Sequence, residues 1–150
     1  MAEPPTVSGF QFREDPVASE VDLADRLGEP IWVPAEWPVR HNPPELLVML
    51  PPHIESGDSA NDFRAHYQLR SLSDGELLVV SGHRRRPGNL ENGLLALEGE
   101  PIETWTRPAD QAPHIVVRAP IWDVHVSGSV ALDTALSVAR SLIEFAVTNQ

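Results

Sequence analysis

The sequence predicts an α+β fold, in which an antiparallel β-sheet meander has a long C-terminal helix packed on one face. Three observations support this prediction. Residues 63–70 alternate apolar and polar side chains, which is the pattern of a half-buried strand. Asp74-Gly75 follows them and is the strongest hairpin signal in the chain. Residues 130–147 repeat apolar side chains at helical spacing, as expected of a helix that covers a sheet.

The sequence of the N-terminal region predicts an extended arm followed by a short helix. Residues 1–19 are acidic and rich in proline, which indicates an extended or disordered arm. A short N-terminal helix should follow, because Ser19 can cap it, Asp22 stands three residues later and Gly28 can end it. Residues 20–150 predict a single α+β domain, since the chain of 150 residues has the size of one domain.

Short strands are expected between this helix and the last one. Prolines are frequent in residues 30–52, and they exclude a long helix there. Pro120 indicates either a hairpin or a bulge in one long strand. The predicted strands are residues 31–33, 46–50, 63–70, 77–83, 93–97, 102–107, 114–118 and 121–127.

The last predicted element is the long helix. Asp133 stands near its start, where the positive end of the helix dipole favours an acidic side chain. The apolar side chains that recur three or four residues apart are Leu132, Ala135, Leu136, Ala139, Leu142, Ile143 and Ala146.

Composition excludes several classes of function. The chain has no cysteine, so disulfides and thiolate metal sites are excluded. A net charge of −11 repels the phosphate backbone of nucleic acids and favours a basic protein as partner. No stretch approaches the roughly 18–20 apolar residues of a membrane span, and residues 1–16 lack the pattern of a signal peptide. We therefore expect a soluble, cytoplasmic protein with no membrane insertion and no cofactor.

One face of the predicted sheet could gather histidines. If the strands share a face, His66, His83, His125 and Asp123 could meet, and imidazole and carboxylate groups are ligands of transition metals. The sequence shows no ligand spacing among them, so a solvated polar face that binds no metal explains the same pattern. We therefore predict that the protein has no metal site. If it did bind a metal, these four residues would be the candidate ligands.

The stretch GHRRRPGN contains the basic cluster of the chain. Arg84, Arg85 and Arg86 stand together on a predicted hairpin loop, and guanidinium groups bind phosphate and carboxylate groups well. The three arginines are therefore the candidate contacts with a partner protein or an anion. The alternative is a charged turn that offsets the acidity of the protein and protects a strand edge.

Sequence motifs of catalysis are absent. The chain contains no GxSxG, P-loop, HExxH or GxGxxG motif, so we expect a protein that is not an enzyme. Aromatic side chains could instead form a ligand platform, but large aromatic residues are mostly core fillers. We therefore expect the tryptophans in the core or at its edge; they are Trp32, Trp37, Trp105 and Trp122.

The stretch PIWVPAEWPV, residues 30–39, resembles the opening of a bacterial domain of unknown function. That domain occurs in the outer parts of membrane anti-sigma factors and in small lipoproteins. It opens with an apolar strand and a Leu-Pro-x-Gly-aromatic turn, and residues 33–37 stand in that place without the glycine. It closes with a strand, a glycine turn and a helix, which residues 124–128 and the phrase at 138–142 resemble. The resemblance implies an α+β sensing or protein-binding module.

These observations lead to two hypotheses of function. The first is a non-enzymatic, protein-binding module of a bacterial protein, which acts as an adaptor, inhibitor or regulator. Its partner is another protein, and the acidic charge favours a basic one. The second is a small-ligand or metal-binding module that uses the histidine-bearing face. No sequence feature indicates whether the protein is a monomer or an oligomer.

Overall fold

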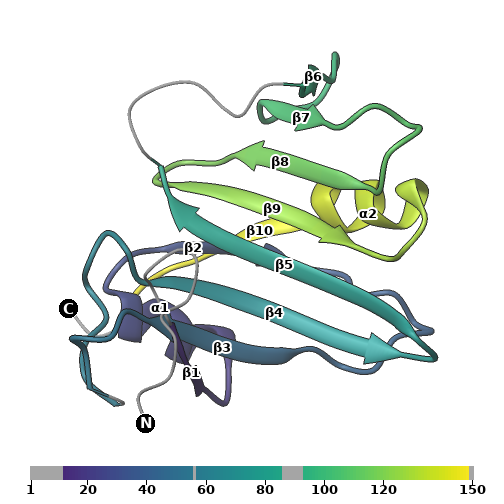
Figure 1. Ribbon diagram of the computed structural model, residues 1–150. Helices are drawn as coiled ribbons and strands as arrows, with labels where there is room; N and C mark the ends of the chain where they lie inside the picture. Colours follow the sequence, from purple (N-terminus) through teal and green to yellow (C-terminus); the bar gives the residue numbers. More distant parts are fainter. Residues whose placement is uncertain (1–11, 56, 86–92, 149–150) are drawn as a thin grey trace, which may run out of the picture.

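The computed structural model describes residues 12–55, 57–85 and 93–148. These residues form an eight-stranded antiparallel sheet and a separate two-stranded sheet (Figure 1). The order of the large sheet is β1-β3-β4-β5-β9-β8-β7-β6, so two meanders join where β5 pairs with β9. Its strands are β1 (Arg13–Pro16), β3 (Glu45–Leu50), β4 (His66–Ser73), β5 (Glu76–Arg84), β6 (Leu95–Ala96), β7 (Thr104–Thr106), β8 (His114–Arg118) and β9 (Trp122–Gly128). The predicted α+β fold with an antiparallel sheet is confirmed.

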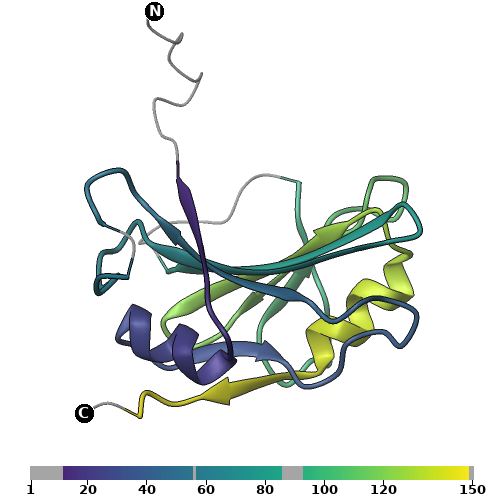
Figure 2. The ribbon, with the colours of Figure 1, turned by 90° about the horizontal axis from the view of Figure 1, so that it is seen from below.

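A second layer covers one face of the large sheet (Figure 2). It contains α1 (Glu20–Leu27), α2 (Leu132–Arg140) and the small sheet of β2 (Ile31–Pro34) and β10 (Leu142–Phe145). Figure 2 shows β2 nearer the large sheet and β10 at the outer border of this layer. In the described part of the chain, no helix or strand covers the opposite face of the large sheet.

The hydrophobic core fills the space between the two layers. Alternate residues of the central strands point into it, so Tyr67, Leu69, Val80 and Val124 are all buried. The alternation in residues 63–70 therefore predicts correctly that Tyr67 and Leu69 point into the core, whereas His66, expected on the outward side, is also buried. Phe63 is an exception, with 62% of its surface exposed, because the strand begins only at His66.

Tyr67 connects the large sheet to β2. Its hydroxyl donates to the carbonyl of Trp32 and accepts the N–H of Trp32 at 3.2 Å. Burial raises the pKa of this hydroxyl, which keeps it protonated as a donor. The ring lies over Gly82 of β5, where a Cβ atom would meet ring carbons at 2.2 Å. Glycine at position 82 therefore makes room for the central tyrosine.

Three of the four tryptophans lie in the core or at its edge, as predicted: Trp32, Trp37 and Trp122. The prediction is wrong for Trp105, which lies half-buried on the face of the large sheet that turns away from the core. Trp122 is fully buried, and its indole N–H donates to the carbonyl of Pro30 at 2.6 Å. Trp37 is half-buried and donates to Ser71 Oγ at 3.3 Å. These bonds satisfy the indole donors while the rings fill the core.

Local turn and cap signals also predicted the structure correctly. Asp74 and Gly75 both have positive φ, 51° and 82°, as the two central residues of a type I′ hairpin require. In α1, Ser19 Oγ accepts the N–H of Asp22 at 3.2 Å, and the helix ends at Gly28. The break at Pro120 is a hairpin between β8 and β9, which pair antiparallel.

The predicted arm, residues 1–19, lies partly outside the described residues. Within it, Arg13–Pro16 form β1, which pairs with β3 at the border of the large sheet. Asp15 of this strand forms an ion pair with Arg26 of α1 at 2.8 Å and accepts a hydrogen bond from the N–H of Gly57 at 2.9 Å. These contacts attach the strand to the rest of the molecule.

The predicted long C-terminal helix is wrong in its second half. Helix α2 has nine residues and ends at Arg140, and Leu142–Phe145 form β10. Ser141 marks the change, because its N–H still donates to Val138 whereas its carbonyl accepts from Ala35 at 2.7 Å. That bond starts the pairing with β2. A short apolar run fits both helical and strand spacing, so the distant strand decides which one forms.

Candidate functional site

The uncovered face of the large sheet brings together most of the residues that the sequence singled out. We call it the open face and define it by the outward residues of adjacent strands. Strand register assigns to it Glu14, Pro16, Glu45, Leu47, Met49, His66, Gln68, Arg70, Leu72, Leu77, Val79, Ser81, His83, Ala96, Trp105, His114, Val116, Arg118, Asp123, His125 and Ser127.

Four histidines form a continuous diagonal row across the open face. They come from β4, β5, β9 and β8, which are adjacent strands. His66 stacks on His83 with ring centroids 4.2 Å apart, and His83 meets His125 edge-on at 5.5 Å. His125 Nδ1 and His114 Nε2 are 2.8 Å apart and share a hydrogen bond. We call these side chains the histidine row.

The row places His66, His83 and His125 on one face, an arrangement that the sequence analysis had given only as a possibility. Sequence reasoning missed His114. The signal was present in the sequence, because His114, Val116 and Arg118 occupy every second position of one strand and therefore share a face. That strand, β8, lies beside β9 in the sheet. The order of the strands was needed to place it beside His125.

Contacts at the start of the row hold the rings in place. Phe12 packs edge-on against His66 at 4.9 Å, and His66 is only 6% exposed. Burial lowers the pKa of His66, so its ring is neutral at neutral pH. His83 Nε2 lies 2.9 Å from Ser81 Oγ, which fixes the next ring.

The predicted candidates for a metal site do not share a centre. No group of three or more His, Cys, Asp or Glu side chains within residues 12–55, 57–85 and 93–148 is arranged to hold a metal ion. The imidazoles stack on one another instead of converging. Asp123 accepts from Arg118 Nε at 3.1 Å and lies 3.6 Å from Arg85 Nε. The carboxylate that a metal would need is therefore bound by two arginines.

Arg84 points away from the open face and supports the core. Its guanidinium donates to the carbonyls of Leu27 at 2.7 Å and Ala65 at 3.1 Å, and also to the carbonyl of Asp62. The same group lies 4.9 Å from the centre of the Trp122 ring, and burial lowers its pKa. Its donors are used to join α1, the turn before β4 and β5.

Arg85 and Arg86 complete the predicted basic cluster. Arg85 donates to the carbonyl of Ala119 at 2.9 Å and approaches Asp123 on the open face. Adjacent strand residues point to opposite sides, so Arg84 and Arg85 do not form one patch. Arg86 lies outside the described residues.

Ser81 and His83 raise the question of nucleophilic catalysis, because their side chains are hydrogen-bonded. Ser81 is only 8% exposed and stands in the middle of β5. β5 pairs with a neighbour on each side, so the backbone donors around Ser81 belong to the sheet. They are not directed at a reacting oxygen as an oxyanion hole requires. We interpret the bond as structural.

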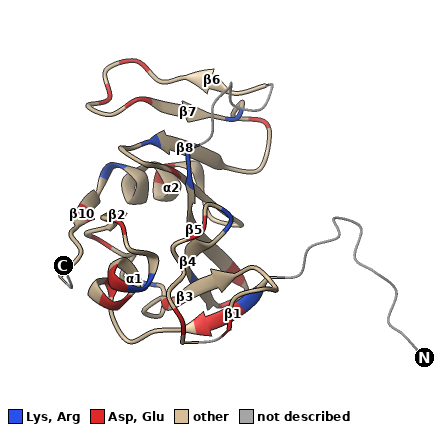
Figure 3. Ribbon diagram, turned by 90° about the vertical axis from the view of Figure 1, so that its left-hand side faces the viewer, with Lys and Arg blue, Asp and Glu red and all other residues tan. Residues whose placement is uncertain are grey.

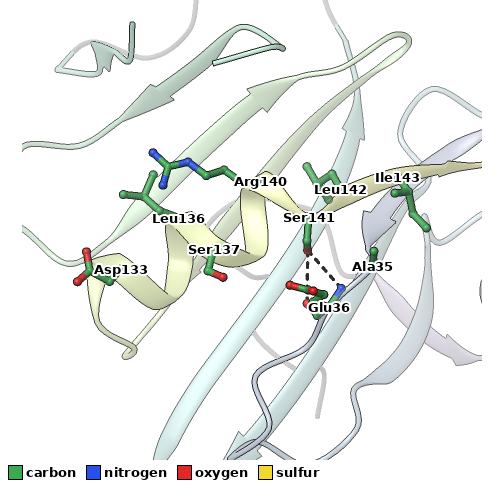
Figure 4. A pocket seen from close by; sticks show the side chains of 9 residues that line it. All are labelled: Ala35, Glu36, Asp133, Leu136, Ser137, Arg140, Ser141, Leu142 and Ile143. Atoms are coloured by element: carbon green, nitrogen blue, oxygen red, sulfur yellow. Dashed lines mark hydrogen bonds between the residues drawn. The ribbon is translucent and has the colours of Figure 1, made fainter. Parts of the chain in front are cut away.

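A groove of about 630 Å³ lies on the other side of the molecule, where α2 runs into β10 (Figure 4). Ser141 fixes its floor, since its Oγ accepts from the N–H of Glu36 at 3.3 Å. Arg140 at the rim is paired with Glu100 at 3.0 Å. The sequence analysis missed this groove because it treated residues 141–143 as helix. Its lining is Ala35, Glu36, Asp133, Leu136, Ser137, Arg140, Ser141, Leu142 and Ile143.

Comparison with models of known protein families, with curated proteins and with solved structures found no match. The resemblance to the anti-sigma-factor domain therefore stays a prediction. Among the described residues, no helix combines the length and the apolar composition that crossing a bilayer would require.

Proposed function

We propose that this chain is a non-enzymatic, protein-binding module of the adaptor, inhibitor or regulator type, and that the open face is its main contact surface. One observation carries the proposal. The side chains of this face form a broad layer across neighbouring strands, and contacts with one another already hold them in place.

Several bonds fix this layer. Arg70 donates two hydrogen bonds of 2.7 Å to the carboxylate of Glu14. Asp123 binds Arg118 at 3.1 Å, and His114 binds His125 at 2.8 Å. Side chains that are already ordered lose little conformational entropy when a partner covers them. The open face is therefore prepared for binding at low entropic cost.

The kinds of side chain on the open face also fit a protein contact. Aromatic residues and arginine are enriched where proteins meet, and they include most residues that dominate binding energy. Trp105 is half-buried at one side of the face, and its N–H is held by Glu103 at 2.7 Å. Val116, its partner in register, is 1% exposed. Trp105 is the anchor that we expect a partner to contact.

The alternative, a small-ligand or metal-binding module on the same face, has less support. A ligand that used the histidine row would have to break the contacts between the rings. We therefore prefer a partner that covers the row as it stands.

Affinity capture with three baits tests the proposal. Wild type, a Trp105→Ala/His83→Ala variant and a Val39→Ala control are immobilised and exposed to native lysate of the source organism. Val39 is fully exposed in the loop between β2 and β3, so its truncation should change nothing. We expect a protein that wild type and control retain and that the open-face variant loses.

Thermal melting of all three baits confirms that each is folded. A partner that all three baits retain equally would remove the open face as the contact surface. If none of the three baits retains a protein, the protein-binding proposal itself fails, and zinc titration of the wild type becomes the test of the alternative.

A further inference from the structure

The two borders of the small sheet differ in their backbone groups. The N–H of Ala35 donates to the carbonyl of Ser141 at 2.7 Å, and the register pairs Val33 with Ile143. Hydrogen-bonded pairs alternate along an antiparallel ladder. Residues 141, 143 and 145 therefore direct their backbone groups at β2, whereas Leu142 and Glu144 direct theirs away from it.

The border formed by β2 is closed. Both backbone groups of Trp32 on this side are bonded to the hydroxyl of Tyr67, which reaches across from the large sheet. Pro34, the other residue on this side, has no N–H to offer. A further strand cannot pair here.

The border formed by β10 pairs with no strand in the described part of the chain; Glu144 on it is exposed, and Leu142 is 8% exposed. Figure 2 shows β10 as the outermost strand of the layer, on the side away from the large sheet. Within the described residues, the outward N–H and carbonyl groups of Leu142 and Glu144 take part in none of the hydrogen bonds that join strands, turns or loops. An open border of this kind is a template for an added strand.

The surroundings of this border indicate the chemistry of the added strand. Ile143 is 44% exposed, which offers an aliphatic contact beside the open backbone groups. Glu36 and Asp133 line the groove next to it (Figure 4). Glu144 is exposed on the strand. None of these three carboxylates forms an ion pair with another described residue. Arg140, the cation of the groove, is neutralised by Glu100.

We propose that the outer border of β10 binds an extended, basic segment of a partner protein as a third strand of the small sheet. Backbone groups of the segment pair with Leu142 and Glu144. An aliphatic side chain of the segment covers Ile143, and an arginine or lysine enters the groove beside Glu36. A second copy of this chain fits less well, because two molecules of charge −11 repel one another. This surface is separate from the open face and adds a second binding site to the module.

A labelled peptide tests the proposal directly. The probe is a short fluorescein-labelled peptide of alternating valine and arginine, followed by fluorescence anisotropy. Glu144→Pro removes the outward N–H and no bond to β2, and Glu144→Gln removes only the charge. We expect Glu144→Pro to weaken binding about tenfold, because it removes the hydrogen bond of the Glu144 N–H and disturbs the adjacent backbone hydrogen bond. Glu144→Gln should weaken binding only about twofold.

Two controls make the result independent of the folding of the proline variant. The same peptide with N-methyl groups on alternate residues keeps its charge and should bind wild type about tenfold more weakly. In the wild-type complex, hydrogen exchange at the Leu142 and Glu144 amides should slow down. The Trp105→Ala/His83→Ala variant should bind the peptide as wild type does, which separates this site from the open face.

Three results would overturn the proposal. One is equal affinity of the normal and N-methylated peptides, which would indicate attraction by charge alone. Another is binding with unchanged exchange at Leu142 and Glu144, which would place the peptide elsewhere. The third is a dimer that sedimentation detects for wild type and for Glu144→Gln but not for Glu144→Pro. That result would mean that the border of β10 binds a second copy of the chain.

Discussion

Tyr67 is the residue on which the contact between the two layers most depends. Its hydroxyl satisfies both outward backbone groups of Trp32, and its ring fills the space that Gly82 leaves. Phenylalanine would keep the ring and leave a buried donor and a buried acceptor without partners. We expect Tyr67→Phe to lower the free energy of unfolding by about 1–3 kcal/mol.

Urea unfolding measures this loss. Trp105→Phe is the comparison, because it removes a hydrogen bond at the surface and should change stability by less than about 0.5 kcal/mol. If the two variants lost the same stability, the bridge to Trp32 would not be a main support of β2.

We expect His66 to make the stability of the protein depend on pH. Burial lowers the pKa of its ring in the folded protein below the value of about 6.5 in the unfolded chain. The unfolded state therefore takes up the proton first, so the contribution is complete above pH 6.5 and declines as the pH falls below it. His83, stacked on it at 4.2 Å, adds repulsion if both rings are charged.

The His66→Phe variant keeps a flat ring between Phe12 and His83 and removes this titration. We expect it to lose less unfolding free energy than wild type between pH 7.5 and pH 5. Urea unfolding at the two pH values gives the comparison. Parallel losses in the two proteins would show that His66 does not control this pH range.

At the scale of the element, α2 lacks a cap that α1 has. Ala131 stands at the N-cap of α2 with extended backbone angles, φ −67° and ψ 153°, and has no side chain to bond the first turn. Ala131→Asp supplies that acceptor on an exposed residue. We expect the variant to be more stable by about 0.5–1 kcal/mol.

Ser19→Ala is the matched change in the opposite direction, since it removes the bond to the N–H of Asp22 in α1. It should cost about 1 kcal/mol, measured by the same urea unfolding. No gain from Ala131→Asp, together with the expected loss from Ser19→Ala, would mean that α2 begins differently from the structure described.

Local signals were enough to predict some elements but not others. Ser19, Gly28 and Asp74-Gly75 act on their own neighbours, so the sequence around them predicts α1 and the β4–β5 hairpin. β10 depends on β2, which lies more than a hundred residues earlier, and local spacing there favoured a helix. The groove, which includes residues of both segments, was hidden for the same reason.

The candidate site shows the same limit. Alternation placed three histidines on one face, but only the pairing of β9 with β8 brings His114 to His125. Three neighbouring arginines were candidate contacts in the sequence, and the sheet turns Arg84 toward Trp122 and Arg85 toward Asp123. Strand order and side-chain direction are tertiary properties that single-sequence patterns do not contain.

At the scale of the whole molecule, charge is distributed unevenly. Figure 3 shows acidic residues gathered on α1 and β1, and the net charge of the chain is −11. On the open face, acids and arginines are paired with each other: Glu14 of β1 with Arg70, and Asp123 with Arg118. The open face is therefore suited to a contact that depends on shape, and the body to attraction of a basic partner.

Salt should separate these two contributions. Raising the salt concentration from about 0.1 M to 1 M shortens the screening length from about 10 Å to 3 Å. Binding of the valine–arginine peptide at β10 should weaken several-fold over this range, as fluorescence anisotropy would show. Affinity that stays constant would contradict a role of Glu36, Asp133 and Glu144 in choosing a basic segment.

The most direct test of the central claim is histidine labelling with diethyl pyrocarbonate, with and without the captured partner. His83, His114 and His125 report on the open face, and His53, half exposed and outside it, serves as the internal control. We predict that a saturating partner protects His83, His114 and His125 while His53 is labelled as before. Unchanged labelling of the row in the saturated complex would contradict the assignment of the open face as the binding surface.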